Sequence, residues 1–236
     1  DNEIIVICSD IDKDNVESFL TLIFNDSLYT PEPEPFYVLK FSSPESYSKL
    51  KKQTNVVVAA IDRDSANTGL KLIKNILPAK QRKNMVLNDP IIVAKNVHAN
   101  NQLFMVINAN SYDHLLGFVD KKRNYIKRNF HEQFIDRQSR FLFSQNNINP
   151  LRDSLSTEFG WSLELPWGWN IVKKVPDSNF VWLGKEMPYQ WIGIGWSEGS
   201  MMNSELAVGQ YLWEWPKNNY KTIQFSEYKF DLKKAS

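Results

Sequence analysis

Residues 55–61 read Asn55-Val56-Val57-Val58-Ala59-Ala60-Ile61, and this stretch decides the fold. Short apolar runs rich in β-branched residues are typical of strands, and a strand without polar alternation is covered on both faces. The run Ile4-Ile5-Val6-Ile7-Cys8 has the same character. We therefore expect residues 3–9 and 55–61 to form neighbouring strands in the centre of one sheet.

Helix signals alternate with strand signals through the first 110 residues. Asp14 and Glu17 have the spacing of a capping box, Ser43-Pro44 opens a short helix, and Pro78 ends a helix over residues 70–77. Further strands are expected at 36–41, 90–97 and 102–109, with an extended, proline-stiffened segment at 29–35. This order predicts an α+β fold whose N-terminal half is a sheet-and-helix sandwich related to the ferredoxin-like layout.

A long helix is predicted from Ser111 to Gln145, with an apolar stripe and a basic opposite side. At 1.5 Å per residue it would span about 50 Å, which exceeds a small domain, so we expect it to bend or to connect two halves. Asn149-Pro150 then starts a shorter helix that Gly160 ends. The expected organisation is an α/β sandwich half (1–110), a long connecting helix plus a short helix (111–160), and a Trp-rich β half (161–236).

All eight tryptophans lie between Trp161 and Trp215. Short aromatic and β-branched segments at 161–165, 169–175, 180–183 and 191–196 are separated by turn residues, which predicts an antiparallel β structure. Gly193 and Gly195 leave room on one face for aromatic rings of neighbouring strands. Most of these indoles are expected in the core, because each can bury about 150–250 Å².

Four tryptophans are the candidate binding residues. Trp167 and Trp169 flank Gly168 at a predicted turn, and Trp213 and Trp215 stand two apart, on one face if that segment is a strand. Exposed aromatics at such positions stack on sugar rings or dock against a protein partner.

Other candidate chemistry has a structural explanation of equal or greater weight. Asp10, Asp12 and Asp14 imitate the start of a calcium loop, but the sixth position is not Gly and the twelfth is Thr21. Asp62 and Asp64 could form a carboxylate pair, and the basic helix side could contact phosphates or be a solvated face. The scattered histidines lack the spacing of a zinc helix. The sequence therefore predicts no catalytic residue, no metal site and no cofactor. The histidines in question are His98, His114 and His131. The basic side of the long helix is formed by Lys121, Lys122, Arg123, Lys127 and Arg128.

Composition narrows the class of partner and the compartment. The formal net charge of +1 gives no general attraction to nucleic acid. Cys8 is the only cysteine, so no internal disulfide is expected, and the longest apolar run is far shorter than the ~20 residues of a membrane helix. Since the chain begins at Asp1, a lipid anchor upstream of it is the expected membrane attachment.

Several motifs follow one another along the chain in a particular order and spacing. They are Pro33-Glu34-Pro35-Phe36, Asn55-Val56-Val57-Val58 before Asp62, Asn88-Asp89-Pro90, the helix with Phe130, Arg137 and Gln138, Leu165-Pro166-Trp167-Gly168-Trp169, and Asn179-Phe180-Val181-Trp182-Leu183. In order and spacing these motifs resemble the DUF4837 family of cell-envelope lipoproteins from Bacteroidetes-like bacteria. The likeness covers about residues 1–200 and implies a location at the cell envelope, either facing the periplasm or at the outer membrane. The family has no assigned activity, so it implies no catalytic residues.

The sequence thus favours a non-catalytic envelope lipoprotein, a binding or assembly module that contacts a protein or a glycan through exposed aromatics. The alternative is a hydrolase that acts on an envelope polymer through carboxylates such as Asp62 or Asp64. An enzyme needs a cleft with at least two convergent ionisable groups, whereas a binding module needs an exposed apolar patch.

Overall fold

The structure is a computed structural model, and it describes every residue except 1, 31, 144–149, 188, 197–213 and 215–236. The chain divides into two compact units, residues 1–148 and 149–236. The expected three-part division differs from this, because the long helix belongs to the first unit and the boundary lies between 148 and 149. No described helix combines the length and the hydrophobicity that a bilayer crossing requires.

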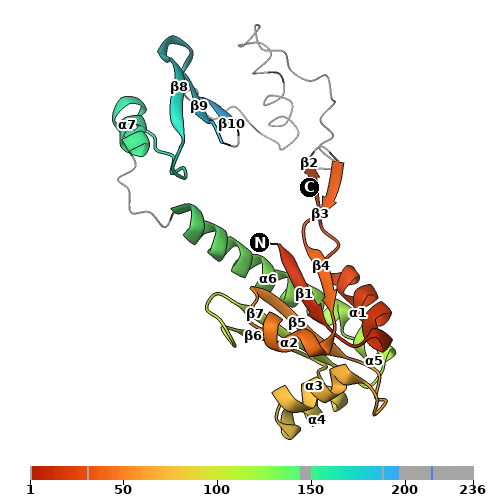
Figure 1. Cartoon of the computed structure of the whole chain (residues 1–236). Helices are drawn as coiled ribbons and strands as arrows, with labels where there is room; N and C mark the ends of the chain where they lie inside the picture. Colours follow the sequence, from red (N-terminus) through yellow and green to blue (C-terminus); the bar gives the residue numbers. More distant parts are fainter. Residues whose placement is uncertain (1, 31, 144–149, 188, 197–213, 215–236) are drawn as a thin grey trace. The chain divides into compact units, whose positions relative to one another are not determined.

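The first unit is built on a five-stranded sheet (Figure 1). Its order is β4-β1-β5-β7-β6, and only the pair β6–β7 is antiparallel. The predicted neighbours are confirmed, since Val6 pairs with Val57 and β5 is the central strand. The strands are β1 (Glu3–Ile7), β4 (Val38–Ser42), β5 (Asn55–Ala60), β6 (Ile91–Lys95) and β7 (Leu103–Asn108).

Helices cover both faces of this sheet, because its strands are apolar on both sides. Alternate residues of β5 belong to separate cores, Val57 and Ala59 to one and Val56 and Val58 to the other. The first core is closed by α1 (Asp10–Ile23), α5 (Tyr112–Leu116) and α6 (Val119–Phe143). The second core is closed by α2 (Tyr47–Leu50), which follows the 3₁₀ turn η1 (Pro44–Ser46), by α3 (Thr68–Ile76) and by α4 (Ala79–Leu87).

Mixed helix and strand are therefore confirmed, but the parallel pairing differs from the expected ferredoxin-like layout. The helices that connect the parallel strands lie on both faces of the sheet, so that successive parallel strands start at the same edge, as in doubly wound α/β folds. The segment expected to be extended and stiff forms a two-stranded hairpin, β2 (Ser27–Thr30) with β3 (Glu32–Pro35).

Three local expectations are corrected. Helix α1 begins at Asp10, four residues before the expected cap at Asp14, because Ser9 already has the extended backbone of an N-cap residue. The long helix is interrupted at Gly117, so α5 and α6 are separate, and α6 packs on α1 and β7. Helix α4 was not expected, because Met85 is its only buried residue and it has little amphipathic pattern.

The described residues of the second unit form a three-stranded antiparallel sheet and one α-helix. The order is β10-β9-β8, and the predicted antiparallel structure is confirmed. Gly160, with φ of 74°, ends the helix as predicted, whereas residues 161–165 form no strand. The elements are α7 (Pro150–Phe159), β8 (Asn170–Val175), the 3₁₀ turn η2 (Pro176–Ser178), β9 (Phe180–Lys185) and β10 (Gln190–Gly195).

One face of this sheet carries the core of the second unit. Leu151 and Leu155 of α7 pack against Val181 and Leu183 of β9, with partly buried residues from 161–171 around them. Residues 161–165 alternate like a strand because Trp161, Leu163 and Leu165 each pack on this core, although no described strand pairs with them.

Candidate functional site

Two regions qualify as sites, and the first is a crevice at the carboxyl edge of the parallel sheet. The chain passes from β1 to β4 on one side and then to β5 on the other, so the strand order reverses between β1 and β5. Helices α1 and α3 leave this edge toward opposite faces of the sheet. Ligands of open α/β sheets bind in the crevice formed at such a switch point.

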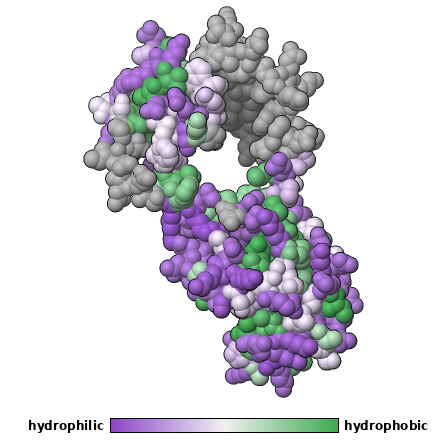
Figure 2. All heavy atoms as spheres, in the orientation of Figure 1, coloured by the Kyte–Doolittle hydropathy of each residue, from purple (hydrophilic) through white to green (hydrophobic). Residues whose placement is uncertain are grey.

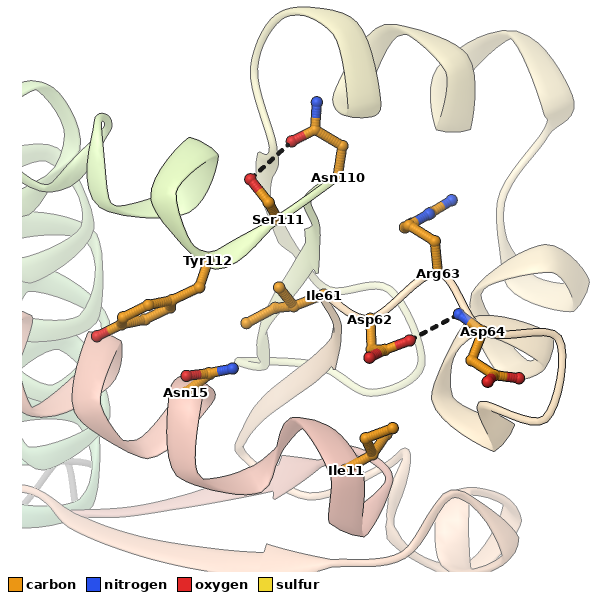
Figure 3. Close-up of a pocket in the computed structure, with 9 residues that line it drawn as sticks. All are labelled: Ile11, Asn15, Ile61, Asp62, Arg63, Asp64, Asn110, Ser111 and Tyr112. Carbon is orange, nitrogen blue, oxygen red and sulfur yellow. Dashed lines mark hydrogen bonds between the residues drawn. The ribbon is translucent and has the colours of Figure 1, made fainter.

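The crevice is an open cavity of about 520 Å³. Figure 3 shows Asp62 and Asp64 on one loop, Asn15 on α1, and Ser111 and Tyr112 at the start of α5. Polar side chains line most of it; the complete lining is Ile11, Asn15, Ile61, Asp62, Arg63, Asp64, Asn110, Ser111 and Tyr112.

Asp62 and Asp64, the carboxylates of the hydrolase hypothesis, both face this region. Asp62 Oδ1 accepts a hydrogen bond from the Asp64 amide at 2.7 Å, and Asp64 Oδ1 accepts one from the Ala66 amide at 2.7 Å. Each carboxylate thus shapes the turn that carries it, as Asp does in Asx turns. The turn accounts for both residues, and the hydrolase hypothesis stays a prediction.

Beneath the crevice, Asp12 is fully buried and holds two segments together. Its Oδ1 accepts hydrogen bonds from the amides of Ile61 (3.1 Å) and Asp62 (2.7 Å), and its Oδ2 accepts one from Asn67 Nδ2 (2.7 Å). Ser9 Oγ donates to Asn67 Oδ1 at 2.6 Å. The acidic residues that imitate a calcium loop therefore include one structural carboxylate, whose partners are the chain's own amides.

Beside this Ser9–Asp12–Asn67 cluster, the close packing of α3 on the sheet requires a glycine at position 69. A Cβ atom there would lie 2.9 Å from the Ala59 carbonyl oxygen and 3.3 Å from the Ser9 amide nitrogen. Both contacts are with backbone atoms, so helix α3 approaches the sheet as closely as it does only because position 69 has no side chain.

The histidines are held in separate local contacts. The Tyr47 hydroxyl and His98 Nε2 form a hydrogen bond of 2.8 Å, His131 contacts the ring of Phe36, and His114 contacts the ring of Phe118. Burial, followed by the charge of Lys51, lowers the pKa of His98. Among the residues that the structure describes, no three His, Cys, Asp or Glu side chains gather as metal ligands would.

The basic side of the long helix makes contacts within its own unit. Lys122 pairs with Asp89 at 2.5 Å and Lys127 with Asp26 at 2.7 Å. Arg123 Nε donates to the Leu22 carbonyl oxygen at 2.8 Å. These contacts favour a structural explanation of the basic run over a phosphate-binding one.

The four candidate tryptophans have different surroundings. Trp167 lies in a turn and is 69% exposed, and Lys185 Nζ stands 5.4 Å from its ring centroid. Trp169 is partly buried and packs on the core of the second unit. Trp213 and Trp215 lie outside the described residues.

The second region is an aromatic pair that the sequence interpretation did not single out. Trp182 on β9 and Trp191 on β10 meet edge to face, with ring centroids 5.7 Å apart, and Trp191 is 65% exposed. The indole of Trp191 lies over Gly184, since a Cβ there would be 3.0 Å from Trp191 Cδ1. Phe180 lies over Gly193 in the same way, as the glycine pattern predicted.

The pair lies on the sheet face opposite the core. Val181 and Leu183 point into the core, so Trp182 between them points to the other face. Trp191 pairs with Gly184, two residues along, and shares that face. The signal in the sequence was an indole placed opposite a glycine on the neighbouring strand, but that can be recognised only once the register is known.

Comparisons with known proteins add nothing to this geometry, since no family model, no curated protein and no solved structure matches the chain.

Proposed function

We propose that this chain is a non-catalytic binding module of the cell envelope, and that its second unit binds a glycan through exposed indoles. The observation that supports the proposal is the Trp182–Trp191 pair on the sheet face that α7 does not cover. Burial of an indole contributes strongly to the stability of a fold. Trp191 is nevertheless 65% exposed beside Trp182, which makes it a candidate contact for a ligand.

A glycan fits this face because the face offers aromatic ring surface with polar groups beside it. Opposite Gly184 stands Asn170, and opposite Trp182 stands Lys173. The negative face of an indole attracts the C–H groups of a pyranose ring, while an amide and an ammonium group reach its hydroxyls. Because Gly184 and Gly193 have no side chain, the rings of Trp191 and Phe180 lie close against the neighbouring strand.

The test is retention on envelope glycans. We expect the full chain to sediment with purified peptidoglycan sacculi or to be retarded in gels that contain envelope polysaccharide. Trp191→Ala and Trp182→Ala should each weaken retention about tenfold or more, as loss of a central aromatic contact does. Trp167→Ala belongs in the same series, since Trp167 is the exposed one of the two predicted tryptophans that the structure describes.

Tyr125→Ala is the matched control, because Tyr125 is an aromatic of the first unit that is 41% exposed. It should leave retention unchanged. The proposal is wrong if the folded Trp182 and Trp191 variants keep full retention, or if the chain binds none of the glycans and cross-links instead to a protein through this face.

The envelope location rests on the DUF4837 resemblance alone. If the resemblance is correct, the full-length precursor incorporates labelled palmitate in its native host and fractionates with the envelope. A precursor that takes up no label and is recovered with the cytosol would contradict the envelope location. Glycan binding by the second unit would still be tested separately.

A further inference from the structure

A smaller cavity is lined by Arg63, on the loop after β5, and by residues of helix α4. Its volume is about 340 Å³, at the lower end of the range for small-molecule sites. Figure 3 shows the Arg63 side chain pointing away from the Asp62 carboxylate. Arg63 therefore contributes to both cavities, which are lined by different residues elsewhere. The lining of the smaller cavity is Arg63, Ala79, Arg82, Lys83, Val86 and Leu87.

The lining of this cavity combines positive charge with apolar surface. Arg63, Arg82 and Lys83 supply three positive charges, and no carboxylate belongs to the described lining. None of the three takes part in an ion pair found among the described residues. Like charges that share a cavity repel one another, so an anion placed between them would be stabilised.

Arg82 has an unsatisfied donor. Its Nε atom is buried and has no hydrogen-bond partner in the part of the chain that the structure describes. A buried donor without an acceptor costs free energy, and such groups in native proteins are explained by a ligand, an ion or a water molecule. The Nε–H group is one arm of the fork through which arginine binds oxyanions.

Asn108 contacts both arginine residues, Arg63 at its guanidinium group and Arg82 at its backbone carbonyl. This fully buried side chain at the end of β7 accepts a hydrogen bond from Arg63 Nη1 at 2.7 Å and donates one to the Arg82 carbonyl oxygen at 3.3 Å. The Ala109 carbonyl oxygen also accepts from Arg63 Nη1, at 3.1 Å. Arg63 is thus anchored through one nitrogen, and α4 is tied to the same point of the sheet.

We infer that this cavity is an anion site that takes the phosphate group of a small ligand, with Arg63, Arg82 and Lys83 as its binding residues. Two guanidinium groups and an ammonium group are the set that proteins use for phosphate, and the apolar wall of Val86 and Leu87 suits a short organic substituent. The site lies at the carboxyl edge of a parallel sheet, where such folds bind ligands. It is independent of the aromatic pair in the second unit.

The experiment titrates the full chain with inorganic phosphate and with glycerol 3-phosphate at constant ionic strength. Binding is followed by calorimetry and by the ¹H–¹⁵N signal of the Arg82 Nε–H group. We expect saturable binding and a shift of that signal. Arg82→Gln and Lys83→Gln should each weaken binding about tenfold, the effect of one lost charge-assisted hydrogen bond.

Lys80→Gln is the matched control, since Lys80 is an exposed lysine of the same helix that does not line the cavity. It should bind both phosphates like the unmodified chain. Lys83 is also exposed, so Lys83→Gln keeps the test valid if Arg82→Gln fails to fold. Absence of saturable binding, equal weakening by Lys80→Gln, or binding to phosphatidylglycerol vesicles without binding to glycerol 3-phosphate would overturn the inference.

Discussion

The two sheets of this protein differ in how many of their faces are covered. In the first unit, alternate residues of β5 enter two separate cores, and all six of its residues are buried. In the second unit, β9 sends Val181 and Leu183 into a core, while Trp182 on the other face is only partly buried. Both sheets have short central strands rich in apolar residues, so apolar character alone does not show how many faces are covered.

The difference lies in the residues between the apolar ones. From Val56 to Ala60, strand β5 has only small and β-branched residues, which suits helices packed on both sides. Strands β9 and β10 mix indoles with glycines, and Gly184 and Gly193 each lie under an aromatic ring of the adjacent strand. No described helix covers that face, on which Trp191 is 65% exposed. The first sheet therefore forms a scaffold for loops at its edge, whereas the second carries its candidate site on its own face.

The largest effect on stability is expected at Asp12, in the first unit. Asp12→Ala removes the acceptor of three hydrogen bonds in the first unit, from the amides of Ile61 and Asp62 and from Asn67 Nδ2. We expect the free energy of unfolding to fall by about 3–5 kcal/mol, because these buried donors lose their acceptor. Urea unfolding followed by circular dichroism measures it. Asp14→Ala, an exposed carboxylate of the same helix, should cost less than about 0.5 kcal/mol; similar losses for both would contradict the structural role of Asp12.

Replacing one aromatic residue by alanine in each unit compares the stability contribution of a helix-covered sheet face with that of the face that carries Trp191. Phe130 is fully buried, 4.9 Å from the ring of Phe24 between centroids. Phe130→Ala should lower the free energy of unfolding by about 3–5 kcal/mol, and Trp191→Ala by about 1 kcal/mol or less, since little of that indole is buried. Equal losses would mean that Trp191 serves packing and would remove the support for the glycan proposal.

A smaller effect is expected where a glycine supports the exposed indole. In Gly184→Ala, the new Cβ would lie 2.7 Å from Val172 Cγ2 and 3.0 Å from Trp191 Cδ1, so both side chains must move. We expect a loss of about 1 kcal/mol together with a shift in tryptophan emission and weaker glycan retention. Gly117→Ala is the control, because its Cβ would meet nothing closer than 3.5 Å. Unchanged emission in Gly184→Ala would show that the ring does not lie over the glycine.

The smallest expected effect is a pH dependence in the first unit. The pKa of His98 is lowered from its ordinary value of 6.5, mainly by burial. The unfolded chain then binds this proton more readily, so the free energy of unfolding should decrease as the pH falls below about 6.5. His98→Gln should flatten that slope, and an NMR titration of the imidazole should give a pKa below 6.5. A midpoint above 6.5 would contradict this contact geometry.

Sequence reasoning worked where the local pattern carries the physical cause. Residues 4–8 and 55–61 are apolar on both faces, which is the direct consequence of covering a strand on both sides, and the two strands are neighbours. Helix α4 was missed because a helix with one buried residue has almost no periodic signal. The parallel order was also beyond local reasoning, because no property of one strand specifies the direction of its neighbour.

The candidate sites were predicted less completely, since they depend on register and on long-range contacts. A turn position correctly marked Trp167 as exposed, but Trp182 and Trp191 face the same side only because β9 and β10 pair as they do. Similarly, three alternating acidic positions pointed to a strand-to-helix turn, while the partners of Asp12 lie about 50 residues away. Such contacts become visible only in the folded chain.

The buried carboxylate of Asp12 also determines how long two loop amides are hidden from solvent. Ile61 and Asp62 follow the last residue of β5, where backbone N–H groups ordinarily exchange with water within a short time. Here both donate to Asp12 rather than to water. Their hydrogens can exchange only when the first turn of α1, which carries Asp12, moves away from this loop, so we expect these two amides to exchange more slowly than the exposed loop residues that follow them.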